Sequence, residues 1–325
     1  MQYNNGALPV MKFFRLLKET YFSWDKNDPW AKSAVIAYYA LFSLPSLLII
    51  TVHFAGIFFG REAVEGRITV EISGLIGKQS AELIQTMIIN AALSESSVLF
   101  IIFGIGMLVF GATGVFFQLQ KALNDIWSVR SKKNTILDTL KRRAISFGMV
   151  LVIGLLLLIS LIITTAINAL SDIIGNYYTE LSAHIVEILN FIFSQIIITT
   201  LFAAIFTLLP DVKIKWKTNF IGAFMTSLLF LAGKYLIGFY FAKSDPASIY
   251  GAAGSLVLIL LWVYYTCLIL FFGAEFTVNW AIYRNIKIEP TSNATLSYEL
   301  EMEELREYKR KVEADKKKAE TLKSN

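Results

Sequence analysis

Long apolar runs separated by short polar segments dominate the pattern of this chain. Runs without a charged residue cover residues 33–60, 96–120, 144–171, 188–210 and 246–274. About 20 helical residues cross a hydrocarbon core of roughly 30 Å, so each run is long enough to span a bilayer. A sixth run, 218–242, has the same character except for Lys234. The pattern predicts an all-α polytopic membrane protein with six transmembrane helices.

These runs divide the chain into three parts. The predicted spans are residues 33–59, 97–119, 144–170, 186–209, 218–241 and 250–281. They form a membrane domain, 33–283, between an N-terminal segment, 1–32, and a charged tail, 284–325, which we expect to be helical and cytoplasmic. The composition agrees with this division, since 55% of the residues are hydrophobic and only 17% are charged. Soluble domains carry roughly a quarter charged residues, so a water-soluble globule is excluded.

The positions of lysine and arginine predict the orientation. Of the 30 such residues, 25 lie in the N-terminal segment, the tail and the loops 121–143 and 213–217, whereas the alternate loops hold four. Cytoplasmic loops retain basic residues, so both termini are predicted to be cytoplasmic in a bacterial inner membrane. Basic residues on the cytoplasmic face then orient the helices and contact anionic lipid. The net charge of +5 therefore requires no nucleic-acid partner.

Two further segments have amphipathic character. Within residues 9–24 the apolar positions recur at helical spacing beside basic residues, a pattern typical of a helix lying in the membrane interface. These apolar positions are Val10, Phe13, Phe14, Leu17 and Tyr21. Asp28 and Pro29 then predict a helix N-cap and a first helical position. The external connection 61–95 predicts a second amphipathic helix, either on the outer surface or over the mouth of the bundle.

The residue inventory argues against catalysis. The chain has two histidines and one cysteine, Cys267, too few for a zinc cluster or for a cysteine nucleophile with its base. We therefore expect no enzyme, no metal and no cofactor. Charges inside the spans are better leads, because each costs about 2.5 to 3.5 kcal/mol at mid-membrane. Lys234, His53 and Glu187 fall at similar depths in the outer half, which predicts either a polar cluster or a lysine that snorkels to the headgroups.

The last span carries a carboxylate near its cytoplasmic end. Glu275 is interpreted either as part of a gate or as a structural carboxylate that fixes helix packing. Its expected partner is the basic cytoplasmic face, for example Lys215 or Lys217, or an exposed helix N-terminus. Glycines at the start of the same span predict a break or a flexible point. These glycines are Gly251 and Gly254, and the adjacent Tyr250 is a further candidate residue of the pathway or gate.

Small and polar residues line one face of the second span. Gly104, Gly111 and Gln118 lie at intervals of seven and are followed by Asp125. This face predicts either tight helix packing or one wall of a substrate pathway. Three tryptophans near the predicted cytoplasmic interface are expected to act as anchors. They are Trp127, Trp216 and Trp280.

Five short blocks resemble the YihY/BrkB family of bacterial inner-membrane proteins. The first two blocks are residues 37–43, with Tyr38 and Tyr39, and residues 123–127, with Asn124 and Trp127. The third block is residues 209–211, with Pro210, and is followed by Trp216 and Gly222. The last two blocks are residues 250–255 and residues 273–275, with Gly273 and Glu275. The resemblance implies a six-helix membrane domain with both ends inside, and it implies little about chemistry. Members have been described as virulence factors, as transporters and as ribonucleases, and the last label has no support in these residues.

Three functions remain open. The first is a secondary transporter or exporter of a lipid-like or amphipathic substrate, in which Lys234 binds an anionic group or gates, and Glu275 organises the cytoplasmic gate. The second is a membrane scaffold that recruits an envelope-assembly protein through residues 290–325, with membrane lipids as its other partners. The third is a lipid-acting enzyme, which needs a carboxylate and a base at one depth, and Glu275 alone does not supply them.

Overall fold

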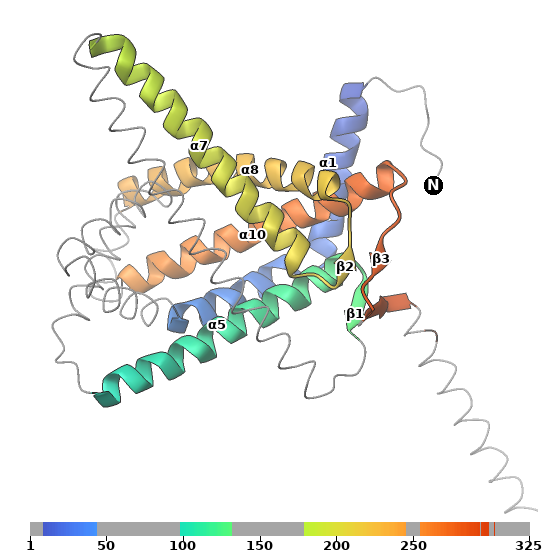
Figure 1. Ribbon diagram of the computed structural model, residues 1–325, viewed down its shortest axis with the longest axis horizontal. Helices are drawn as coiled ribbons and strands as arrows, with labels where there is room; N and C mark the ends of the chain where they lie inside the picture. Colours follow the sequence, from blue (N-terminus) through green and yellow to red (C-terminus); the bar gives the residue numbers. More distant parts are fainter. Residues whose placement is uncertain are drawn as a thin grey trace, which may run out of the picture.

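Long helices make up most of the computed structural model, which describes residues 9–43, 98–131, 179–244, 254–292, 294–298 and 302. The helices in these residues are α1 (Pro9–Lys26), a helix at 29–43, α5 (Val98–Ile126), α7 (Thr179–Leu208), α8 (Trp216–Ser244) and α10 (Gly254–Tyr283). Figure 1 shows α8 and α10 running through the middle of this group.

Three of these helices are long and apolar enough to cross a membrane. The segments are Phe191–Leu208 in α7, Trp216–Phe239 in α8 and Leu256–Tyr283 in α10. They match the predicted spans 186–209, 218–241 and 250–281. The predicted span 97–119 falls within α5 apart from its first residue. Span 144–170, the external segment 61–95 and the part of span 33–59 after residue 43 lie outside the described residues.

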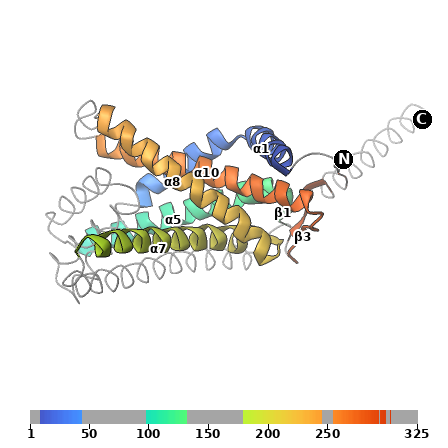
Figure 2. The same cartoon turned by 90° about the horizontal axis from the view of Figure 1, so that it is seen from above.

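The α8 helix packs between α7 and α10, and α10 also contacts α1 and α5. Figure 2 shows α1 on one side of α10, with α5 and α7 on the other. Small residues permit the α8–α10 contact, because Gly222 packs against Thr277 and Gly273 packs against Thr226. In a membrane, helices associate through such close van der Waals packing. Close packing at a small residue also joins α5 to the helix at 29–43, where Gly114 contacts the ring of Tyr39.

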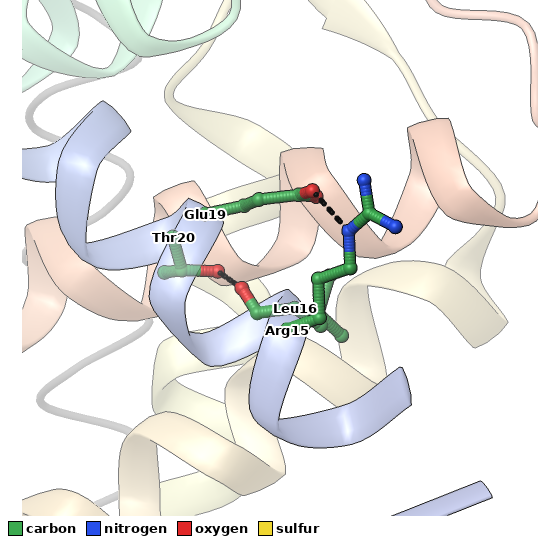
Figure 3. A network of polar contacts seen from close by, with 4 residues as sticks. All are labelled: Arg15, Leu16, Glu19 and Thr20. Carbon is green, nitrogen blue, oxygen red and sulfur yellow. Dashed lines mark hydrogen bonds and ion pairs between the residues drawn. The ribbon is translucent and has the colours of Figure 1, made fainter. Parts of the chain in front are cut away.

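The α1 helix turns one face to the protein and the opposite face outward. Leu16, Thr20 and Trp24 are buried, and Figure 3 shows the Thr20 hydroxyl donating to the Leu16 carbonyl at 2.8 Å. Figure 3 also shows the 3.0 Å pair between Arg15 and Glu19. The predicted apolar stripe lies on the outward side, where its members Phe13, Phe14 and Tyr21 are 43%, 66% and 51% exposed. This arrangement leaves aromatic rings available to the membrane interface.

Three helices end at residues with left-handed backbone conformation. Asp28, Ser128 and Asn285 have φ values of 50°, 53° and 52°. At the end of α10, the Ile286 amide donates to the Ala281 carbonyl at 2.9 Å, in a Schellman motif with Asn285 as its left-handed residue. Asp28 also accepts from the Ala31 amide at 3.4 Å, as the predicted N-cap requires. Each turn redirects the chain at the same end of the bundle.

Two short antiparallel pairings close this end. Strand β1 (Val129–Ser131) pairs with β4 (Ala294–Leu296), and β2 (Val212–Lys213) pairs with β3 (Glu289–Pro290). Figure 2 shows the strands beyond the ends of the helices. Residues 289–290 and 294–296 are therefore strands and not part of the helix predicted for 284–325. The pairings attach the start of the tail to the loops after α5 and α7.

The apolar core lies next to these strands. Trp127, Phe206 and Phe271 are exposed by 2% or less, and they come from the end of α5, from α7 and from α10. The prediction that Trp127 anchors the chain at the membrane interface is wrong, because its indole is packed inside the protein. Trp216, 65% exposed, has the exposure that an interface anchor requires.

Candidate functional site

The best-defined polar contact within a membrane-crossing helix belongs to Glu275. Its side chain is 2% exposed on α10, and its Oε1 accepts a hydrogen bond from Nδ2 of Asn27. Asn27 lies in the turn after α1. The end of α1 is held to α10 by Trp24, whose indole donates a hydrogen bond to the Leu268 carbonyl at 3.2 Å. The partner of Glu275 is therefore an N-terminal asparagine, and the expectation of Lys215 or Lys217 is wrong.

An ion pair adjoins this contact. The Lys32 ammonium lies 2.9 Å from the Asp125 carboxylate and also acts electrostatically on Glu275. We call Asn27, Lys32, Asp125 and Glu275 the polar junction. Its members come from the turn after α1, the helix at 29–43, α5 and α10, so it ties the N-terminal segment to two further helices.

A separate cluster surrounds Asp211, directly after Pro210. The Asn124 amide donates to Asp211 Oδ2 at 2.9 Å, and the Asp211 backbone amide donates to Asn124 Oδ1 at 2.8 Å. The Ser131 hydroxyl also donates to Asp211 Oδ2 at 2.8 Å. The Thr291 amide donates to the Asp211 carbonyl at 2.9 Å. This Asp211 cluster therefore joins α5, β1, the α7–β2 turn and the start of the tail.

Two consecutive residues connect these sites. Asn124 faces Asp211, while Asp125 faces Lys32. Two of the five blocks that carry the resemblance, 123–127 and 209–211, therefore meet in space. Polar side chains with several hydrogen-bond partners fix a single arrangement of the segments that carry them. The end of α5 is the element that both sites share.

The structure describes only some of the other predicted site residues. Lys234 is half-buried on α8, Gln118 is half-buried on α5, and Gly254 begins α10. Glu187 lies in α7, and His53, Tyr250 and Gly251 lie outside the described residues. The predicted Lys234, His53 and Glu187 cluster stays a prediction.

Two residues of the small face of α5 pack against the helix at 29–43. The position of a Cβ on Gly111 would be 2.7 Å from the Cβ of Ser43, and Gly114, one turn further on, meets Tyr39. This contact supports the packing interpretation of Gly111. Gly104 lies in the same helix, and Tyr38, next to Tyr39, is 56% exposed.

One polar layer was missed by sequence reasoning. Between α7 and α8, the Gln195 amide donates to the Ser227 hydroxyl at 2.6 Å, and the Thr199 and Ser227 hydroxyls are 2.8 Å apart. Polar side chains that hydrogen-bond across helices join spans in a membrane. The available signal was Gln195 and Thr199 one helical turn apart in an apolar run. Within the described residues, no group of three His, Cys, Asp or Glu side chains could hold a metal ion.

The fold and these contacts define a helical integral membrane protein. The family model described as virulence factor BrkB matches residues 23–295, and the chain belongs to this family. The match confirms the resemblance read from the five blocks.

Similar proteins are described as UPF0761 membrane proteins. A UPF0761 membrane protein of Idiomarina loihiensis is 25% identical over 235 residues, covering 72% of this chain and 78% of the relative. One of Tolumonas auensis is 27% identical over 57% of this chain and 60% of the relative. One of Klebsiella pneumoniae is 30% identical over 55% of this chain and 63% of the relative. No solved structure matches this chain significantly.

Proposed function

We propose that this chain is a secondary transporter or exporter of an amphipathic, lipid-like substrate, with the polar junction as its gate. The observation that carries the proposal is Glu275, a carboxylate that is 2% exposed within an apolar helix. Charged side chains at such depth are costly and usually line a pathway or face a partner. The chain needs no ATPase and no catalysis for this role.

The contact partner of Glu275 supports a gate. Asn27 reaches Glu275 from the N-terminal segment and not from a neighbouring span. Lys32 pairs with Asp125 of α5 from the same segment. A rigid-body shift of α1, the turn after it and the start of the helix at 29–43 would break both contacts together, leaving the end of α10 open. The proposal requires this segment to have two discrete arrangements, because a gate must open and close.

The proposed location is the bacterial inner membrane with both termini in the cytoplasm. Among the described residues, basic side chains follow α5, α7 and α10 at the end of the bundle that carries the strands: Arg130, Lys213, Lys215, Arg284 and Lys287. The positive-inside rule then makes this the cytoplasmic end. The polar junction would accordingly gate the cytoplasmic side.

Reconstitution of the full chain into liposomes tests the proposal. Fluorescent phospholipid analogues in both leaflets, and dyes for proton and potassium flux, report transport. We expect flux above that of empty liposomes, and a drop of at least about tenfold for Glu275→Gln, because the amide cannot carry the charge. Glu289→Gln is the matched control, since Glu289 is an exposed carboxylate paired with nearby Lys287. Absence of lipid or ion flux from folded protein contradicts the proposal.

A second candidate is a scaffold that recruits an envelope-assembly protein through the tail. The pairing of β3 and β4 with β2 and β1 favours it, because these strands attach the start of the tail to the membrane domain at a defined place. Because residues 289–296 belong to the fold, the discriminating deletion removes only 299–325. A scaffold loses its cellular function with this deletion, whereas a transporter keeps its flux.

A further inference from the structure

A pocket of about 810 Å³ opens at the strand end of the bundle, outside the polar junction and the Asp211 cluster. Its lining comes from Thr207, the segment around β2 and the turn after α10. Four basic side chains contribute to it: Lys213, Lys215, Arg284 and Lys287. Glu289 is the one acidic side chain among the lining residues, and it is paired with Lys287 at 3.2 Å. The pocket therefore has surplus positive charge.

The depth of the pocket is fixed by three membrane-crossing segments. Thr207 is the next-to-last residue of the segment in α7, Lys215 immediately precedes the segment in α8, and Arg284 immediately follows the segment in α10. We expect all three positions near the boundary between hydrocarbon and headgroups, because the apolar segments end there. A ligand in this pocket would have its polar part at the level of lipid phosphates.

The local structure holds the basic groups in place. The Lys215 carbonyl accepts from the Thr218 amide at 2.9 Å, so Lys215 stands at the N-terminus of α8, which favours an anion nearby. The Arg284 guanidinium lies 5.8 Å from the Trp280 ring centre, a cation–π contact that orients it. The Schellman motif at Asn285 then returns the chain so that Lys287 lies on the same pocket.

We propose that this pocket binds the phosphate-bearing headgroup of an anionic phospholipid from the adjacent leaflet. A soluble phosphate compound offers the same charge, but the depth of the three span ends favours a lipid. The bound lipid would hold α7, α8 and α10 together at the strand end. The proposal is independent of transport, because it concerns a surface outside the polar junction.

Thermal unfolding of the purified full chain in detergent tests the proposal. Cys267 is the one cysteine of the sequence and is buried, so its reaction with a thiol-reactive fluorophore on heating reports unfolding. Phosphatidylglycerol, phosphatidylcholine and glycerol phosphate are added separately, and native mass spectrometry counts retained lipid. Phosphatidylglycerol should raise the melting temperature of the native chain, whereas phosphatidylcholine and glycerol phosphate should not.

Substitutions of the basic residues test whether phosphatidylglycerol binds at the pocket. Each basic residue near a membrane surface contributes about fivefold to the affinity for anionic lipid, so Lys213→Gln with Arg284→Gln should weaken phosphatidylglycerol binding about 25-fold. The matched control, Lys26→Gln with Lys121→Gln, removes the same charge from exposed positions outside the pocket. If the pocket variant fails to fold, Lys213→Gln with Lys215→Gln replaces it, since both side chains are exposed.

Two outcomes overturn the proposal. One is an equal response of pocket variant and control to phosphatidylglycerol, which would show attraction by overall charge only. The other is a shift with glycerol phosphate that depends on the same residues, which would assign the pocket to a soluble phosphate compound. A failure of the flux assay leaves both readouts unaffected, so the two proposals are tested separately.

Discussion

Thr226 of α8 packs directly onto the backbone of Gly273 of α10. The reverse contact, Thr277 of α10 on Gly222 of α8, repeats it one turn away. Each threonine also donates its hydroxyl to the glycine carbonyl of its own helix at 2.7 Å. The two spans thus approach through a pair of antiparallel Gly-x-x-x-Thr patterns, with the polar groups satisfied inside each helix.

This contact predicts the effect of adding one methyl group. Gly273→Ala should destabilise the protein by about 1 to 3 kcal/mol, because the new Cβ overlaps Thr226 and forces the helices apart. Gly238→Ala is the control, since no atom lies within 4 Å of a Cβ at that position. The midpoint of heat-induced Cys267 labelling measures both. Equal midpoints for the two variants would contradict the packing argument.

The Asp211 cluster predicts strong coupling between two family blocks. Asn124→Ala removes both hydrogen bonds of the reciprocal pair, and Asp211→Ala removes the one that the Asp211 carboxylate accepts, so their effects should not add. A double-mutant cycle of unfolding free energies should give a coupling energy of about 0.5 to 3 kcal/mol. Strict additivity of the two effects would show that the pair is not a unit.

The strand pairings predict where the chain can be shortened. Truncation after residue 298 should leave the unfolding midpoint nearly unchanged, because the partners of β1 and β2 are kept. Truncation after residue 287 should lower stability by about 2 kcal/mol or more, since several backbone hydrogen bonds are lost and buried Val129 and Val212 lose their cover. Equal midpoints for the two truncations would mean that the pairings contribute nothing.

The transport proposal predicts water access near Lys234. In a Cys267→Ser background, Lys234→Cys should react with a membrane-impermeant thiol reagent faster than Leu236→Cys. Lys234 is half-buried, whereas Leu236 is 67% exposed on the same membrane-crossing helix and would face lipid. A short cysteine cannot snorkel, so labelling at 234 alone reports a water-filled path. Absence of labelling at both positions favours the scaffold.

The spans could be predicted because hydrophobicity is a local property. A helix satisfies its own backbone hydrogen bonds, so a charge-free run of sufficient length is already a complete membrane-crossing element. The predicted span 218–241 lies inside α8, and Lys234 within it did not interrupt the helix. The N-cap at Asp28 was predictable for the same reason, since its hydrogen bond reaches only to Ala31.

The strands and the partners of buried polar groups could not be predicted. Val129 pairs with Leu296 across more than half of the chain, and strands of two or three residues leave no periodic pattern. Trp127 is buried because a distant part of the chain covers it, which residue type alone does not reveal. The Glu275 partner was missed because Asn27 carries no charge to suggest it.

The sequence by itself determined that this is a helical membrane protein, because the length and apolarity of each run decide whether it can enter a bilayer. The tertiary structure alone decided that Asn27 meets Glu275, that Asn124 meets Asp211, and that four basic side chains share one pocket. These contacts join segments that are far apart in the sequence. Only the packing of the helices against one another sets the distances between them.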